Sequence, residues 1–117
     1  MAGNNYRDLE DRTLEFAKRT IKLCKVLPRN TVNMELTKQL IRSAGSIGAN
    51  YREANESLGK KDFVHRLRIA RKEAKETNYW LELVKEQNPD LGEQMNDLSR
   101  ETQELRNILS SIINKSA

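Results

Sequence analysis

The chain contains a single histidine, His65, and a single cysteine, Cys24. These two residue types most often serve as general bases, nucleophiles and metal ligands. On a helix, His65 shares its side with Lys61 and Arg68 and has no serine or cysteine beside it, so this spacing predicts no nucleophilic triad. Cys24 falls on the apolar side of the first predicted helix, where we expect a small core residue. As the only cysteine it can form no intrachain disulfide.

Metal and phosphate chemistry are the next possibilities for a chain rich in carboxylates. A di-iron centre in a helical bundle needs a Glu-x-x-His motif on each of two helices, whereas the residue three positions before the only histidine is Asp62. Gly45 and Gly48 lie inside a helical pattern and not between a strand and a helix, so they predict no phosphate-binding loop. The sequence therefore predicts a protein that is not an enzyme, with no catalytic residue, metal or cofactor.

A row of basic residues is the strongest candidate binding feature. Its members recur at intervals of four and three residues, which places them on one side of a helix: Lys61, His65, Arg68, Lys72 and Lys75. Such a row can follow a phosphate backbone, although a run of charge is also typical of a solvated helix face. Because the row has no aromatic side chain, it favours contact with the backbone of structured RNA or a duplex over stacking on bases.

Two further rows run along the same segment. One has the spacing of a buried apolar seam: Phe63, Leu67, Ala70, Ala74, Thr77, Leu81 and Val84. The other sets apolar side chains beside charged ones: Arg66, Ile69, Glu73, Glu76, Trp80 and Leu83. An ordinary surface helix needs only one apolar stripe, so the mixed row indicates a second contact. We expect Ile69, Trp80 and Leu83 to form an interface between subunits.

A row of short polar residues precedes this segment: Ser43, Ser46, Asn50, Glu53 and Ser57. A solvated helix face would explain this row. The row lies directly beside the apolar side of its helix, however, and Glu73 and Glu76 occupy the comparable flank of the following helix. The second hypothesis is therefore a partly buried polar network that contains Ser43, Ser46, Asn50, Glu53, Glu73 and Glu76.

Four predicted helices position these rows. The first covers about residues 6–27 and ends before Pro28. The second covers about 32–56, after a cap at Asn30 or Thr31. The third follows a cap at Asp62 and extends to about residue 87, and the fourth starts near Leu91. Short joints between amphipathic helices predict an all-α fold, an up-down-up-down antiparallel four-helix bundle that forms one domain over residues 1–117.

Apolar spacing also predicts the buried face of the other helices. In the first it comprises Leu9, Thr13, Phe16, Thr20, Leu23 and Leu27, widened by Ala17, Ile21 and Cys24. In the second helix the buried face comprises Leu36, Leu40, Ala44, Ile47, Tyr51 and Ala54. In the fourth helix it comprises Leu91, Met95, Leu98, Thr102, Leu105, Leu109 and Ile112, and Ile108 and Ile113 broaden it. Gly45 and Gly48 either end the second helix early or permit close approach of another helix.

Composition agrees with long helices, since 32% of the residues are charged, 5% are aromatic and there are only two prolines and five glycines. The net charge is +4, with cations concentrated in residues 60–77 and acids in excess in residues 78–117. This asymmetry could attract polyanions, or the two segments could pair with each other. No apolar run is long enough to cross a bilayer, so we expect no membrane contact. The N-terminus lacks the apolar stretch of a signal peptide, and we expect a cytoplasmic protein.

Residues of the second and third helices resemble a known family. The pattern is Gln39-Leu40-x-Arg42-Ser43-Ala44-x-Ser46-Ile47-x-Ala49-Asn50-x-x-Glu53-Ala54, then Lys61-Asp62-Phe63, then Ala70-x-Lys72-Glu73-Ala74-x-Glu76-Thr77-x-Tyr79-Trp80-Leu81, with Tyr6-x-x-Leu9-Glu10 at the start. It resembles the bacterial four-helix bundle proteins encoded within 23S rRNA intervening sequences. Many relatives have glycine where this chain has Ala54, which favours a second helix that continues past Glu53.

The resemblance implies an antiparallel four-helix bundle that assembles into a homopentamer and has no recognised catalytic residues. The chain is also similar, more distantly, to the accessory protein of diversity-generating retroelements, which binds nucleic acid and a reverse transcriptase. Our leading hypothesis is an oligomeric bundle whose basic row contacts RNA or DNA nonspecifically. The rival is a protein-interaction scaffold in which those cations pair with acids of a neighbouring fourth helix: Glu93, Asp97, Glu101 and Glu104.

Overall fold

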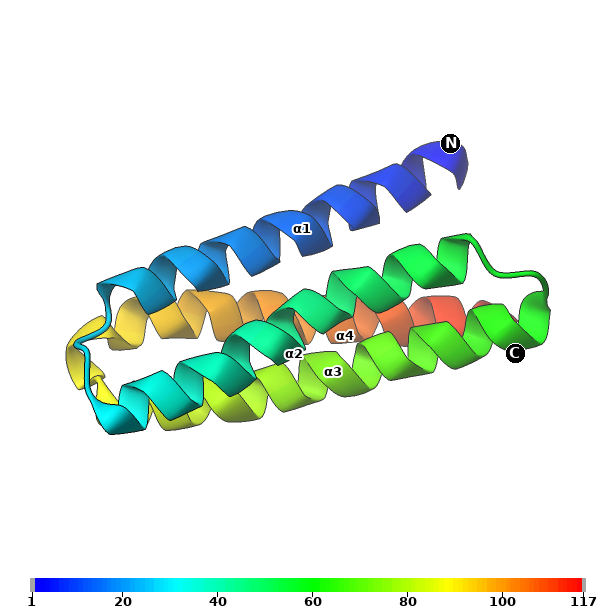
Figure 1. Cartoon of the computed structure of the whole chain (residues 1–117). Helices are drawn as coiled ribbons and strands as arrows, with labels where there is room; N and C mark the ends of the chain where they lie inside the picture. The colour runs from blue at the N-terminus through cyan, green and yellow to red at the C-terminus, as the bar shows by residue number, and fades with distance from the viewer. Residues whose placement is uncertain (1, 117) are drawn as a thin grey trace.

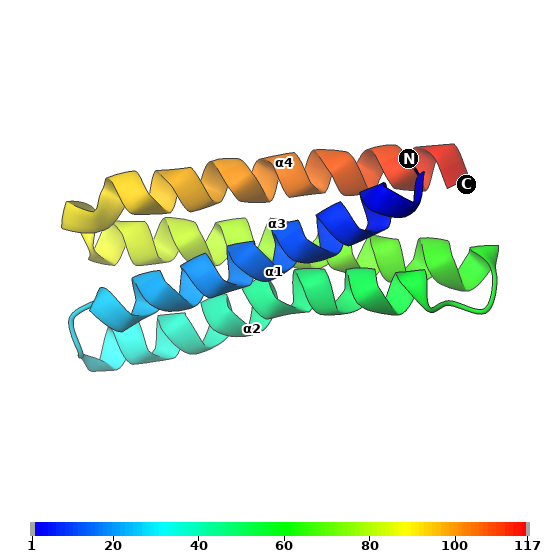
Figure 2. The same cartoon turned by 90° about the horizontal axis from the view of Figure 1, so that it is seen from above.

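Four long helices and one short turn make up the chain. The computed structural model describes residues 2–116, with side chains from residue 8 onward, so the side chain of Tyr6 lies outside the described part. The elements are α1 (Ala2–Val26), α2 (Thr31–Asn55), α3 (Lys60–Gln87), the 3-10 turn η1 (Pro89–Leu91) and α4 (Gly92–Ser116). Consecutive helices run in opposite directions, as Figures 1 and 2 show. The predicted antiparallel four-helix bundle is confirmed.

The four helices pack around one elongated core. α2 packs against α1 and α3, and α4 packs against α3 and α1, whereas α1 and α3 make no mutual contact within the described chain. These two helices therefore occupy diagonal corners of the bundle. The principal extents are 45 × 23 × 19 Å. α1 runs obliquely to the other helices (Figure 2), and Figure 1 shows its N-terminal half diverging from α4.

The predicted seams form most of the core. All six residues of the seam predicted on α1 are buried, and α2, α3 and α4 bury nearly all of theirs. Ile21, predicted to widen the α1 stripe, is instead 40% exposed. On α3 the structure buries Val64, where the spacing favoured Phe63, and on α4 it buries Ile113, predicted only to broaden the stripe, more fully than Ile112; Phe63 and Ile112 are half-buried. The period was correct, and the error is a rotation of about one residue at these helix ends.

Threonines in the core satisfy their hydroxyl groups locally. Thr13 donates to the carbonyl of Leu9 over 2.9 Å and Thr102 donates to the carbonyl of Leu98 over 2.6 Å. Thr20 and Thr77 make the same bond to the carbonyl four residues earlier. A buried hydroxyl group without a partner would destabilise the fold. These intrahelical bonds explain why a β-branched polar residue can replace an aliphatic one in the seams of α1, α3 and α4.

α2 and α3 begin with different kinds of N-terminal residue. Asn30 caps α2, because its side chain accepts a hydrogen bond of 2.8 Å from the backbone N–H of Asn33. At α3 the predicted cap was wrong: the helix starts after Gly59, which offers no side-chain cap, and Asp62 lies within the first turn. An acid in that turn still interacts favourably with the helix dipole.

Helix α2 continues without a break through both of its interior glycines. Gly48 is buried, and a Cβ atom at this position would lie 2.7 Å from Oγ1 of Thr13 on α1. Gly45 has no atom within 4 Å of the corresponding point. The close approach predicted for the glycine pair therefore holds at Gly48 alone. The helix also passes Ala54 and ends at Asn55, as the alanine at this position favoured.

Candidate nucleic-acid interface

The basic row lies on one continuous helix. α3 is unbroken from Lys60 to Gln87, so residues three and four apart share a side. All five members of the row are exposed, and they lie opposite the seam that α3 buries in the core. Figure 1 shows α3 at an edge of the bundle, with its outer side free of the other helices. The helix thus presents Lys61, His65, Arg68, Lys72 and Lys75 together.

The described residues do not neutralise the charge of this row. Among the described residues, none of the five forms an ion pair, whereas neighbouring Arg66 lies 4.0 Å from Asp62. Arg71, at the margin of the row, donates a hydrogen bond of 3.3 Å to Ser110 of α4. Unpaired cations on one rigid side are suited to a polyanion, because binding need not first break an internal ion pair. We call this surface the α3 basic face.

The mixed row of α3 lies on the flank that faces α2. Ile69, Trp80 and Leu83 are each partly buried, and Trp80 packs against the core. The ring of Trp80 meets the exposed ring of Tyr79 edge-on, with centroids 5.2 Å apart. The three residues predicted to form a subunit interface therefore each keep some accessible surface. The flank also carries carboxylates.

The six residues predicted to form a polar network divide into two groups. Ser43 is buried, and its hydroxyl donates to the carbonyl of Leu40 over 3.2 Å. Ser46 and Asn50 are half-buried and also donate to carbonyls of their own helix, while Glu53 is exposed. These bonds do not join α2 to α3.

Glu73 and Glu76 instead bind Arg42, which reaches them from α2. Arg42 donates to Glu73 over 3.3 Å and to Glu76 through a second nitrogen. Burial raises the pKa of Glu73 above its ordinary value, the nearby Glu76 raises it further, and Arg42 only partly offsets both effects. The two carboxylates and the guanidinium form an ion cluster that ties α2 to α3. The sequence did not predict that Glu73 and Glu76 bind Arg42, because spacing within one helix does not identify a partner on another helix.

A second ion cluster, also missed in the sequence, holds α1 to α4. Arg12 donates bonds of 2.7 and 2.8 Å to the two carboxylate oxygens of Glu101, and a third of 2.8 Å to Glu104. The hydrogen bond with Glu101 raises the pKa of the Arg12 guanidinium above its ordinary value. A bidentate pair of this kind is geometrically specific and stronger than a single ion contact. The helices that it joins are otherwise in limited contact.

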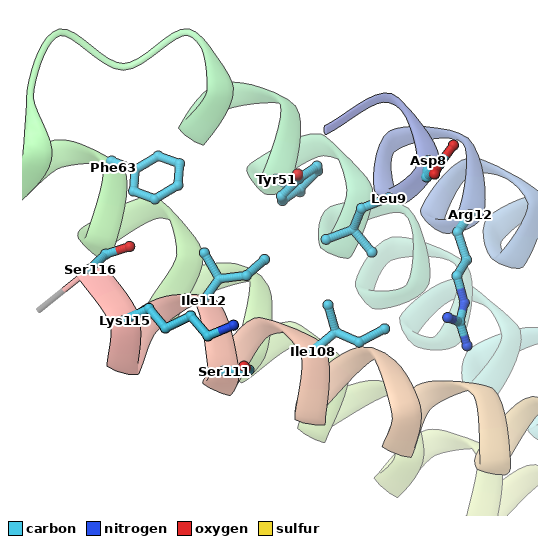
Figure 3. Close-up of a pocket in the computed structure, with 10 residues that line it drawn as sticks. All are labelled: Asp8, Leu9, Arg12, Tyr51, Phe63, Ile108, Ser111, Ile112, Lys115 and Ser116. Carbon is cyan, nitrogen blue, oxygen red and sulfur yellow. The ribbon is translucent and has the colours of Figure 1, made fainter. Parts of the chain in front are cut away.

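A groove of about 610 Å³ opens where α1 diverges from α4 (Figure 3). Its lining is largely apolar, with Leu9, Ile108 and Ile112 from α1 and α4 and with Tyr51 and Phe63 from the other two helices. Asp8, Ser111 and Lys115 also line the groove, but no hydrogen bond or ion pair joins them among the described residues, as a catalytic arrangement would require. In the described part of the chain, no group of three or more potential ligands could hold a metal ion. No helix there is both long and apolar enough to span a bilayer.

Comparisons with known proteins agree with this architecture. The sequence model of the family described as 23S rRNA-intervening sequence protein matches residues 8–111. The chain is also similar to the crystal structure of a protein of unknown function from the S23 ribosomal protein family of Bacteroides thetaiotaomicron. The two chains are 39% identical, with a TM-score of 0.85, over 93% of this chain and 97% of that one. No significant match links the sequence to a curated protein. Neither similarity indicates an enzyme family.

Proposed function

The chain belongs to the 23S rRNA-intervening sequence protein family, and from this premise we propose that it binds nucleic acid, chiefly RNA, through the α3 basic face. Binding is nonspecific and non-enzymatic. The observation that carries the proposal is a helix with five exposed basic side chains on one side, none of them in an ion pair with the described chain. Contacts of this kind are made to phosphates and carry no sequence information. An RNA partner implies a cytoplasmic location.

Oligomerisation is the second part of the proposal. The resemblance implies a homopentamer, and Ile69, Trp80 and Leu83 supply a partly exposed apolar flank for the subunit contact. Repeating the α3 basic face around a ring multiplies weak contacts, because linked sites gain avidity without any new interaction. The mass of the protein in solution tests this part. We expect an oligomer, and we expect I69E/L83E to shift the mass toward the monomer.

The charges of α4 support this proposal over the rival scaffold. That hypothesis requires Glu93, Asp97, Glu101 and Glu104 to accept the basic face of a neighbour. Glu101 and Glu104 already bind Arg12 of their own chain, and Asp97 binds Arg100. Only Glu93 of this set has no ion pair within the described residues. Forming the scaffold contact would therefore require exchange of existing pairs.

Charge reversal tests nucleic-acid binding directly. R68E/K72E removes two adjacent members of the basic face, and both side chains are exposed, so the fold should persist. We expect its affinity for a structured RNA to fall by about tenfold or more at physiological salt. K38E/R100E makes the same change of charge on α2 and α4 and serves as the control. Equal affinity of R68E/K72E and the wild-type protein would overturn the proposal.

A further inference from the structure

A second basic row lies on α1 and has no part in the function proposed above. Lys18, Lys22, Lys25 and Arg29 recur at intervals of four, three and four residues, the same rhythm as the α3 row. Residues 16–34 contain no aspartate or glutamate. All four cations are exposed, and the three on the helix lie opposite the buried seam of α1. We call this surface the α1 basic face.

Little of this charge is neutralised by the described chain. Lys18 lies 3.3 Å from Glu15, and both side chains are more than half exposed, so solvent screens the pair. Lys22 shares a shallow groove with Asp97 of α4, but the carboxylate of Asp97 binds Arg100. The structure pairs neither Lys22 nor Lys25 with an acid among the residues it describes. The surface is therefore available to an external anion.

The two basic faces point in opposite directions. α1 and α3 occupy diagonal corners of the bundle, and on each helix the cations lie opposite its own buried seam. The shorter extents of the bundle, 23 and 19 Å, separate the two faces. A single straight segment of nucleic acid cannot touch both faces, because the body of the bundle lies between them.

We propose that the α1 basic face binds a second segment of nucleic-acid backbone, so that one protomer bridges two segments. The inference rests on the proposed function, since it assigns the first segment to the α3 basic face. Lys18 to Lys25 covers two helical turns, about 10 Å, which allows contact with several successive phosphates. The face has no aromatic side chain, so the contact is electrostatic and independent of base sequence.

An assay with two labelled RNA duplexes measures bridging. One duplex carries a donor dye and the other an acceptor, and energy transfer reports that both lie on one particle. K18E/K22E/K25E should reduce the transfer by about tenfold or more, while its affinity for a single duplex stays within about threefold of wild type. K38E/R52E/K115E makes the same change of net charge at exposed positions of α2 and α4 and should bridge as the wild-type protein does. Circular dichroism checks that each variant is folded.

Wild-type energy transfer by K18E/K22E/K25E overturns the bridging proposal, because α3 basic faces alone would then hold both duplexes. If the same variant has also lost binding to vesicles containing phosphatidylserine, the α1 basic face binds an anionic lipid surface instead. The proposed function fails separately, if K61E/R68E/K72E binds a single duplex as tightly as the wild-type protein.

Discussion

Asn33 and Asn88 exchange two hydrogen bonds between their side-chain amides, each 2.9 Å long, at the end of the bundle where α1 meets α2 and α3 meets α4. Both residues are buried. The second N–H of Asn33 donates to the carbonyl of Pro28, and that of Asn88 donates to the carbonyl of Val84. The pair therefore joins the first turn of α2 to the residue that ends α3, and the bond to Pro28 ties the loop after α1 to the same point.

Removing either side-chain amide should destabilise the bundle more than the loss of so few atoms would, because the partner amide stays buried. N33A or N88A leaves the other amide buried and partly without partners, and each should lower the free energy of unfolding by about 1–3 kcal/mol. The double variant should lose less than the sum of the two single losses, because no orphaned amide remains. Denaturation by guanidinium chloride measures all three. Strict additivity would show that the reciprocal bonds contribute nothing.

Alanine substitutions at the two interior glycines of α2 should have opposite effects. G45A adds a methyl group in open space and should stabilise the protein by about 1 kcal/mol, because alanine is the better helix former. G48A sets a methyl carbon against Thr13, where it would lie 2.7 Å from the hydroxyl oxygen, and should destabilise it by about 1–3 kcal/mol. Thermal unfolding compares the pair. A stabilised G48A would contradict the close approach of α1 and α2.

Most of the correct predictions came from the apolar periodicity within single helices. The seams of α1 to α4 follow from apolar spacing, since one buried stripe per helix is a local property of the chain. Ile21 shows the limit. It lies at the edge of the predicted stripe on the oblique helix α1, and it is 40% exposed (Figure 2). How wide a stripe the neighbouring helices cover depends on the packing between helices, which no pattern within one helix reports.

Contacts between distant polar residues could not be predicted for the same reason. Arg12 and Glu101 are separated by 89 positions, and Asn33 and Asn88 by 55. Arg12 and Glu101 lie on helix faces where a polar residue would ordinarily be solvated, and Asn33 and Asn88 lie near the joints between helices. The α3 basic face, in contrast, depends only on the continuity of one helix, and that continuity was predicted correctly. Its role in binding stays a prediction.

The ion pair between Arg12 and Glu101 should stabilise the packing of α1 against α4. R12M keeps the aliphatic stem but leaves Glu101, which is 14% exposed, without its partner. Because Arg12 itself is 36% exposed and solvent screens the pair, we expect a loss of only about 1 kcal/mol. Amide hydrogen exchange in α1 should increase, with little change in α2 and α3. E104Q alters the exposed third bond and serves as the control. Unchanged exchange in R12M would contradict this account.

Cys24 should react slowly with alkylating reagents. Burial raises the pKa of its thiol from 9.0 to about 11, and the thiolate is the reactive form. At pH 8 the folded protein should therefore react on the order of a hundredfold more slowly than the unfolded protein, and the rate should rise steadily up to about pH 11. Deprotonation favours the unfolded chain, so stability should begin to fall as the pH rises above the unfolded pKa near 9. Mass spectrometry of iodoacetamide adducts checks the rates, with the protein in guanidinium chloride as reference. Equal rates would contradict burial of the thiol.

The dependence of RNA affinity on salt concentration tests the α3 basic face most directly. Each phosphate contact contributes about −0.9 to the slope of log affinity against log salt for a duplex. R68Q/K72Q removes two exposed cations without adding repulsion, so the slope should become shallower by about 2, whereas K38Q/R100Q should leave it unchanged. The same slope for R68Q/K72Q and the wild-type protein would show that the outer side of α3 does not contact the nucleic acid.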